Sequence, residues 1–224
     1  LGLPYVFSTQ QKAWELLDGP IGDELAKKLE PKNLIQLSWM DNGIRQITNN
    51  KRPITTPDDL KGIKLRTPPD PSTVDMFQAM GASTQQINFS ELYIAIQTGV
   101  VDGQENPLAN IHAGKLHEVQ KFISITNHKY ESTPFLMSKR SWDRLSDADR
   151  KAVQEAAAEA TALQRRLSQE ADDKLLAELK AKGVLVSTPD KAAFAKATAD
   201  VVAKWEAGPI GAYVRKVVAA AKAP

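Results

Sequence analysis

The chain contains no cysteine, and this absence excludes disulfide bonds, thiolate metal sites and cysteine nucleophiles. Its three histidines, His112, His117 and His128, show no metal-ligand spacing such as His-Glu-x-x-His, so no metal site is expected. The sequence also lacks a Gly-x-Ser-x-Gly elbow, a phosphate-binding glycine loop and a dinucleotide fingerprint. Several enzyme classes are thereby removed, and no cofactor is predicted.

Long apolar runs and an excess of charge of one sign are missing too. No run is long enough to cross a membrane, and no signal peptide is recognisable. Lysine and arginine total 29 against 27 acidic residues, and the two signs are interleaved, so no nucleic-acid surface is indicated. The first residues, Leu1–Pro4, include no initiator methionine, which suggests a processed or truncated product.

What is present begins with clear helix punctuation. Thr56–Asp59 and Thr188–Asp190 each offer a threonine N-cap, a proline at the first helical position and an acid in the first turn. Helices are also expected over 72–80, over 90–97 and from Pro107, and strands over 63–66, 85–87, 100–103 and 121–126. This alternation predicts an α/β fold with βαβ units and a parallel sheet.

The C-terminal part has a different pattern. An Ala-, Glu- and Lys-rich stretch from Ser146 to about Lys182, ended by Gly183, predicts one long or kinked helix. A strand over 184–186, a helix from Pro189 toward Trp205 and a final Ala-rich helix after Gly208 should follow. No flexible linker occurs, so two lobes, if present, would be joined by the long helix.

Two polar residues follow predicted strands and are the best candidates for a site. Arg66 ends the first strand and Asn106 follows the run Val100–Gly103, so both should reach the same rim of the sheet, where ligands of open α/β sheets bind. A guanidinium beside an amide there is typical of a carboxylate clamp. By themselves, Arg66 could form a structural salt bridge and Asn106 could be only a helix N-cap.

Several motifs occur together in a fixed order. They are Asp41–Arg45, Lys51–Ile54, Asp59–Arg66, Phe89–Tyr93, Gln97–Pro107, Val119–Phe122 and Leu136–Lys139. With them the chain resembles the periplasmic solute receptors of tripartite ATP-independent periplasmic (TRAP) transporters, of the dicarboxylate-receptor (DctP) type. The likeness runs from about Leu3 past Trp142 and weakens in the Ala-rich tail.

The resemblance implies a periplasmic receptor with two α/β lobes that close on an organic acid and deliver it to a membrane permease. It implies that Arg66 pairs with the substrate carboxylate and that Asn106 hydrogen-bonds near it. In some members an arginine like Arg45 and an aromatic like Phe89 also contact the ligand, and Thr133 stands where others carry a polar ligand-facing side chain. The ligand would be a monocarboxylate, a dicarboxylate or a sugar acid.

Three of these side chains have alternative interpretations. Arg45 lies in a polar segment and could equally be a solvated surface charge. Phe89 and Trp39 are more typical of core or lobe-interface aromatics, although rings at a cleft would suit a flat organic acid.

The resemblance also implies a division into lobes. Residues 1–42 and 131–170 would form a partial first lobe, and 43–130 with 171–224 the second. The chain would lack about the first third of the family's usual length. A monomer is expected, with dimerisation through the final helices as an alternative.

Two other function classes are considered. An enzyme acting on small carboxylates would use an acid pair such as Asp102 and Glu105, but these residues more plausibly fix the backbone around Asn106. A sensory domain would bind the same acids and signal through a partner helix. Its gene would encode a transmembrane segment, whereas a transport receptor's gene would begin with a cleavable signal.

Overall fold

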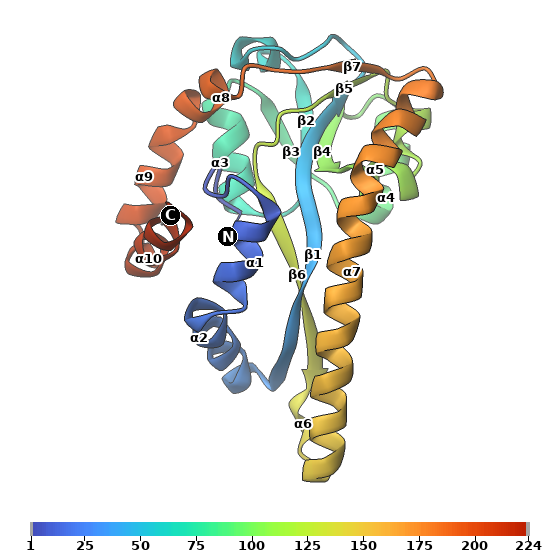
Figure 1. The fold of residues 1–224 in the computed structure, drawn as a ribbon. Helices are drawn as coiled ribbons and strands as arrows, with labels where there is room; N and C mark the ends of the chain where they lie inside the picture. The colour runs from blue at the N-terminus through green and yellow to red at the C-terminus, as the bar shows by residue number, and fades with distance from the viewer. Residues whose placement is uncertain (1, 223–224) are drawn as a thin grey trace.

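The fold is α/β and is described here from a computed structural model covering residues 2–222, apart from the side chain of Asp173 (Figure 1). The α-helices are α1 (Gln10–Leu17), α2 (Pro20–Leu29), α3 (Pro71–Ala79), α4 (Phe89–Gln97), α5 (Leu108–Ala113), α6 (Lys139–Trp142), α7 (Asp147–Ala181), α8 (Lys191–Ala197), α9 (Ala199–Ala207) and α10 (Gly211–Lys222). The 3₁₀ helices are η1 (Glu30–Lys32), η2 (Pro57–Leu60) and η3 (Leu116–Glu118). The strands are β1 (Leu34–Asn49), β2 (Lys64–Thr67), β3 (Ser83–Gln86), β4 (Gly103–Pro107), β5 (Phe122–Ser124), β6 (Tyr130–Ser138) and β7 (Leu185–Ser187).

The sheet is mixed, so the prediction of a parallel sheet was only partly correct. Its order is β3-β2-β4-β1-β5-β7, with β6 paired to β1. β2 is parallel to β3 and β4, and β5 is parallel to β7, as the alternation of strands and helices predicts. β1 is antiparallel to β4, β5 and β6. No strand was predicted at β1 or β6, and these two strands introduce the antiparallel pairs.

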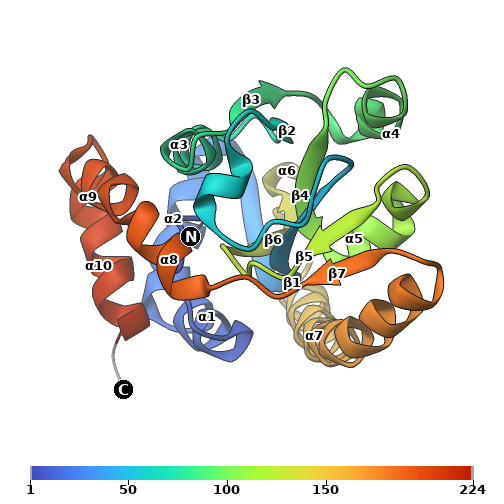
Figure 2. The same ribbon diagram turned by 90° about the horizontal axis from the view of Figure 1, so that it is seen from above.

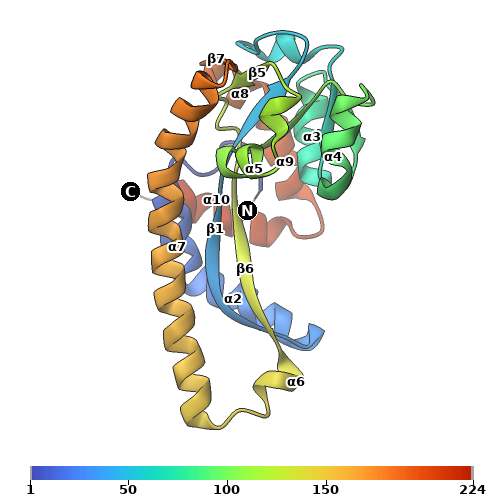
Figure 3. The same cartoon turned by 90° about the vertical axis from the view of Figure 1, so that its right-hand side faces the viewer.

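β1 connects two parts of the molecule. Over Leu34–Ile44 it pairs with β6, and over Arg45–Asn49 it pairs with β4, so one strand of 16 residues belongs to both ladders. The register with β6 shifts between Asp41 and Gly43, where Gly43 has a φ of +118°. Figure 3 shows β1 and β6 as a long ribbon below the wider upper part of the sheet.

The long helix is confirmed and runs beside this ribbon. The Ser146 hydroxyl accepts a hydrogen bond from the backbone N–H of Asp149, and α7 continues for 35 residues to a left-handed Gly183. Midway along α7, Gln164 both accepts from and donates to the backbone of Asp41, at 2.9 Å in each case. Its side-chain amide therefore satisfies β1 backbone groups as a neighbouring strand would. Figures 1 and 3 show α7 running alongside β1.

Helix boundaries follow the predicted signals with some corrections. The capping box of Thr56 and Asp59 is present, but it starts a single 3₁₀ turn. Thr188 is not an N-cap, because Asp190 takes that position by accepting from the N–H of Ala192. The helix expected from Pro189 toward Trp205 is divided at Thr198, whose hydroxyl donates to the carbonyl of Phe194.

The strand expected over 100–103 was placed too early. Val100 is more than half exposed, and Asp102 forms the entry to β4 by exchanging bonds with the backbone of Lys64. The strand itself covers Gly103–Pro107. Asn106 therefore lies within β4, and the N-cap of α5 is Pro107, so the interpretation of Asn106 as a helix cap was wrong.

Three apolar clusters stabilise the fold. The first joins Leu3 and Val6 to α1, α2 and α10, the second lies between β2, α3 and α8, and the third between α4, α5, β5 and the end of α7. Seen from above, α3 and α8 lie on one side of the sheet and α4, α5 and α7 on the other (Figure 2). Along residues 2–222, no helix combines the length and apolarity needed to cross a membrane.

Candidate functional site

The two leading candidates lie on neighbouring strands. β2 and β4 are parallel and adjacent, with Arg66 opposite Gln104, and Asn106 follows two residues later on β4. β1 runs on the other side of β4 and places Gln46 opposite Asn106 and Arg45 opposite Pro107. Arg66, Asn106 and Arg45 are thus gathered where β2 and β4 end, as the sequence predicted for the first two.

Arg66 is a buried cation without an ion-pair partner in the described part of the chain. Its side chain is 3% exposed, and its Nε donates to the carbonyl of Ile87 at 2.7 Å. Among the described residues no carboxylate lies within ion-pair distance of its guanidinium, so the structural salt bridge considered from sequence does not form. Burial lowers the pKa of Arg66, and the charge of Arg45 lowers it further. The Ile87 contact orients a guanidinium that still needs an anion.

Arg45 is also 3% exposed but is fully engaged, so its interpretation as a solvated surface charge was wrong. Its Nε and Nη2 bind the two carboxylate oxygens of Glu105 at 2.5 and 2.9 Å, and its Nη1 binds Glu131 at 2.5 Å. Its Nη2 also donates to Oδ1 of Asn106 at 3.0 Å. Arg45 therefore orients Asn106 and forms ion pairs with two acids.

Glu105 is fully buried at the centre of this network. Burial alone would raise its pKa, but the charges of Arg45 and Lys129 and a hydrogen bond with His128 hold the pKa well below its ordinary value. His128 Nε2 lies 3.0 Å from Glu105, and its Nδ1 lies 2.8 Å from the Thr126 hydroxyl. Burial lowers the pKa of His128, which favours a neutral ring that donates to Glu105.

The Asn106 amide is held in one orientation. Its Oδ1 accepts from Arg45 and, at 3.4 Å, from Asn110. Its Nδ2 donates to Oε1 of Gln104 at 2.5 Å. The nitrogen has a second hydrogen, for which the described residues show no acceptor, so Asn106 can donate to a ligand at this rim.

A third buried cation, Lys129, was not identified from the sequence. Its Nζ donates to the Thr73 hydroxyl at 2.6 Å and lies 3.4 Å from Asp70 and 3.6 Å from Glu131. Asp70 also caps α3 by accepting from the N–H of Ser72. Of the three acids, only Glu105 was considered from the sequence; the fold brings it together with Lys129 and Glu131, which flank the first residue of β6, and with Asp70, which precedes α3.

The other three predicted residues are not brought into this network. Phe89 begins α4, two residues after the carbonyl that binds Arg66, and its side chain is 45% exposed, so it is not a core residue. Thr133 is exposed on β6 opposite Met40. Trp39 is partly buried on β1 and packs against the first apolar cluster, where it also lines a cavity of about 450 Å³ between α2 and α7.

Two of the three histidines form a stacked pair. His112 and His117 stack with ring centroids 5.4 Å apart, and Lys182 Nζ lies 3.4 Å from Nε2 of each ring. Within residues 2–222, no group of three acidic, histidine or cysteine side chains is arranged to hold a metal ion.

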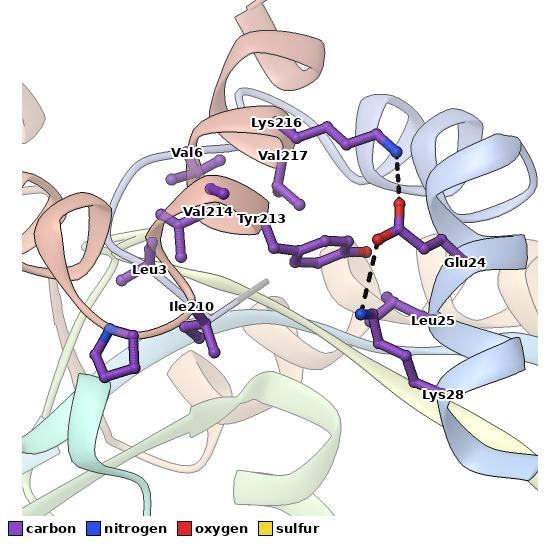
Figure 4. A pocket seen from close by; sticks show the side chains of 12 residues that line it. Leu3, Val6, Glu24, Leu25, Lys28, Ile210, Tyr213, Val214, Lys216 and Val217 are labelled. Atoms are coloured by element: carbon purple, nitrogen blue, oxygen red, sulfur yellow. Dashed lines mark hydrogen bonds and ion pairs between the residues drawn. The ribbon is translucent and has the colours of Figure 1, made fainter. Parts of the chain in front are cut away.

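A larger pocket of about 730 Å³ lies between α2 and α10, away from the Arg66 network (Figure 4). Its wall includes Leu3, Val6 and Val217, and Glu24 at its rim binds Lys216 at 2.5 Å. Tyr213 closes one side by donating to the carbonyl of Ile21 at 3.2 Å. No residue predicted to bind substrate lines this pocket.

Comparison with known proteins identifies what these features resemble. The profile of DctP, "Bacterial extracellular solute-binding protein, family 7", matches residues 1–208. The 2,3-diketo-L-gulonate-binding periplasmic protein YiaO of Escherichia coli is 37% identical over 90% of this chain and 62% of its own length. The chain spans 37% to 62% of the length of the first three curated relatives it matches.

Solved structures give the same result. A TRAP periplasmic solute binding protein from Polaromonas sp. JS666, bound to D-erythronate, superposes with a TM-score of 0.93 at 38% identity, covering 99% of this chain and 73% of that one. Another from Sulfurospirillum deleyianum, with bound succinate, has a TM-score of 0.90 at 34% identity, covering 98% and 73%. These neighbours are ligand-binding receptors with a two-lobe fold.

Proposed function

Because this chain belongs to family 7 of the bacterial extracellular solute-binding proteins, we propose that it binds an organic acid by its carboxylate and delivers it to the membrane permease of a TRAP transporter. The protein acts as a receptor in the periplasm and not as an enzyme. The ligands named for its solved neighbours differ in their number of carboxylates, since D-erythronate has one and succinate has two.

One observation carries the proposal for this chain's own residues. Arg66 is a buried guanidinium with its Nε bonded to Ile87 and with no carboxylate at ion-pair distance in the described structure. A bidentate arginine–carboxylate pair would supply both the missing charge and a fixed direction. Asn106, held by Arg45 and Gln104, presents its remaining N–H beside it. The clamp thus consists of Arg66 as anchor and Asn106 as an auxiliary donor.

The remaining predicted residues have lesser roles in this proposal. Arg45 acts by orienting Asn106. Phe89 is exposed, two residues after the Ile87 carbonyl that binds Arg66, and in this proposal its ring covers an acid held by Arg66. Trp39 and Thr133 lie farther along the β1–β6 ribbon and would contact only a ligand that extends in that direction.

We also propose the two-lobe division into 1–42 with 131–170 and 43–130 with 171–224. The register shift at Gly43 and the start of β6 at Tyr130 support boundaries at these points. α8 supports the assignment because Phe194 packs into the cluster around β2 and α3. α10 is the exception, because Val214 and its neighbours pack with α1.

Calorimetric titration of Arg66 variants tests the carboxylate anchor. Arg66→Ala should weaken acid binding by roughly 3–5 kcal/mol, because the ligand carboxylate would be enclosed without its partner. Arg66→Lys should restore only part of that loss, since an ammonium lacks the planar pair of donors. Lys64→Ala, an exposed position on the same strand, is the matched control. Unchanged acid affinity in Arg66→Ala would refute the proposal.

Delivery to a permease is tested by transport. Proteoliposomes containing a TRAP permease should accumulate labelled acid only when this protein is added, and Arg66→Ala should abolish the accumulation. Uptake that is equal with and without the protein would contradict a transport role.

A further inference from the structure

Six charged side chains, the proposed anchor Arg66 among them, set the charge balance of the proposed site. The cations are Arg45, Arg66 and Lys129, and the anions are Glu105, Glu131 and Asp70. Glu105 binds Arg45 through both oxygens, Glu131 lies 2.5 Å from Arg45 and 3.6 Å from Lys129, and Asp70 lies 3.4 Å from Lys129. Three carboxylates thus share two of the cations, and only Arg66 remains without an ion pair in the described structure.

The electrostatic balance follows from these pairs. The formal charges of the six groups cancel, so a ligand with one carboxylate brings a single negative charge to Arg66. A second carboxylate would need another cation, but Arg45 and Lys129 are already engaged by protein acids. Glu131 and Asp70 are the acids of this set that solvent reaches, with side chains 33% and 35% exposed, and a second ligand carboxylate near them would meet like charge. A like charge disfavours the ionised form of a neighbouring carboxylate.

Glu131 also has a carboxylate oxygen that can accept a further hydrogen bond. Its Oε2 accepts from Arg45 and, at 2.8 Å, from Asn42. Among the described residues, the cation nearest its Oε1 is Lys129, at 3.6 Å, which is beyond hydrogen-bond distance. A carboxylate oxygen with unused lone pairs is an acceptor for a hydroxyl group. Arg45 holds Glu131 through Nη1 and Oδ1 of Asn106 through Nη2, so Glu131 lies beside the amide that forms the proposed clamp with Arg66.

We infer that the acid bound at Arg66 carries one carboxylate and at least one hydroxyl group that donates to Oε1 of Glu131, and that Glu131 and Asp70 exclude dicarboxylates. This inference rests on the proposed function and adds the ligand class. Glu131 and Asp70 are the residues that determine specificity, whereas Arg66 determines that an acid binds.

Calorimetry with acids of equal carbon number tests the inference. The four-carbon set is erythronate, tartrate and butyrate, and the six-carbon set is gluconate, glucarate and hexanoate. Each set compares a hydroxy monocarboxylate with its dicarboxylate and with an acid that lacks hydroxyls. In whichever set binds, the hydroxy monocarboxylate should bind at least about ten-fold more tightly than the other two.

Charge-removing variants assign this selectivity to residues. In Glu131→Gln, the ratio of the affinity for the hydroxy monocarboxylate to that for the dicarboxylate should fall by about ten-fold. The substitution removes a like charge while keeping the side-chain size. Asp70→Asn is the second variant, and it keeps an N-cap residue for α3. Glu155→Gln, on the exposed face of α7, is the matched control.

The outcomes separate the two claims. Tighter binding of a dicarboxylate, or an unchanged preference in both Glu131→Gln and Asp70→Asn, would overturn the inference and leave the proposed function standing. Absence of binding by every acid, or binding that Arg66→Ala does not affect, would overturn the proposed function as well.

Discussion

Glu105 meets Arg45 with both carboxylate oxygens, although 60 residues separate the two in the chain. Both side chains are buried. They join β4, the strand paired with that of Arg66, to β1, the longest strand of the sheet. The pair fixes the position of Asn106 and leaves Arg66 as the cation available to a ligand. Several expectations follow from this division of roles.

Removal of Arg45 should destabilise the protein strongly. Arg45→Ala leaves Glu105 buried without its main partner, and the free energy of unfolding should fall by about 3–5 kcal/mol. Urea denaturation measures this difference. Lys151→Ala, which removes an exposed partner of Glu155, should cause no measurable change. Equal stability of the two variants would mean that the buried pair makes no net contribution.

Acid should destabilise the protein below about pH 6.5, through His128. Its folded-state pKa is lowered from 6.5 by burial, so the unfolded chain binds the proton first and stability falls as the pH drops below that value. The pKa of Glu105 is lowered too, but from 4.5. Its contribution to the free energy of unfolding is therefore complete above about pH 4.5 and is lost only at lower pH. Unfolding free energies measured between pH 7.5 and 5 therefore report the titration of histidine and not that of Glu105.

His128→Gln should make this pH dependence shallower, while His112→Gln, outside the network, serves as the control. His117, whose pKa burial also lowers, remains in both variants, but its ring stacks on His112, so the decisive comparison is between His128→Gln and the unmodified protein. A slope that is the same in His128→Gln and in the unmodified protein would contradict the assignment.

Asn106→Asp should weaken acid binding more than Asn106→Ala does. The aspartate places an internal carboxylate beside Arg66 and removes the N–H offered to the ligand, whereas alanine only removes the donor. We expect a loss of about ten-fold or more in the affinity measured by calorimetry for Asn106→Asp relative to Asn106→Ala. Equal affinities of the two variants would show that charge at this position is unimportant.

Gly43→Ala should destabilise the register shift in β1. Gly43 has a φ of +118°, and an added Cβ would lie 3.0 Å from Cβ of Pro107. Gly62→Ala is the matched control, because Gly62 also has a positive φ of +76° but has no atom within 4 Å of an added Cβ. Each substitution should lower the free energy of unfolding by about 1–2 kcal/mol, because alanine disfavours a left-handed backbone. Gly43→Ala should lower it further because of the contact with Pro107. Thermal unfolding distinguishes them.

Local signals in the sequence predicted the helices better than the sheet. Ser146 and Gly183 mark α7 because caps act on adjacent residues, and Arg66 and Asn106 were placed near each other because parallel strands end at one rim. The error at Thr188 arose because Asp190 offers a competing cap two residues later.

The missed features depend on contacts that sequence spacing does not reveal. β1 lacks an alternating pattern over its whole length because its two halves face different neighbours. The ion pairs that occupy Arg45 involve Glu105 and Glu131, distant positions that only the folded chain brings together. Whether Arg45 would be solvated or paired could not be decided without them.

The ribbon of β1 and β6 has a consequence for the behaviour of this chain in concentrated solution. α7 covers part of the free edge of β1 through Gln164. β6, however, pairs with β1 on one side only, and no other described strand lies along its second edge. Such an edge is a template for another strand. Self-association of this 224-residue polypeptide should therefore increase with concentration, and light scattering during purification would be its first visible sign.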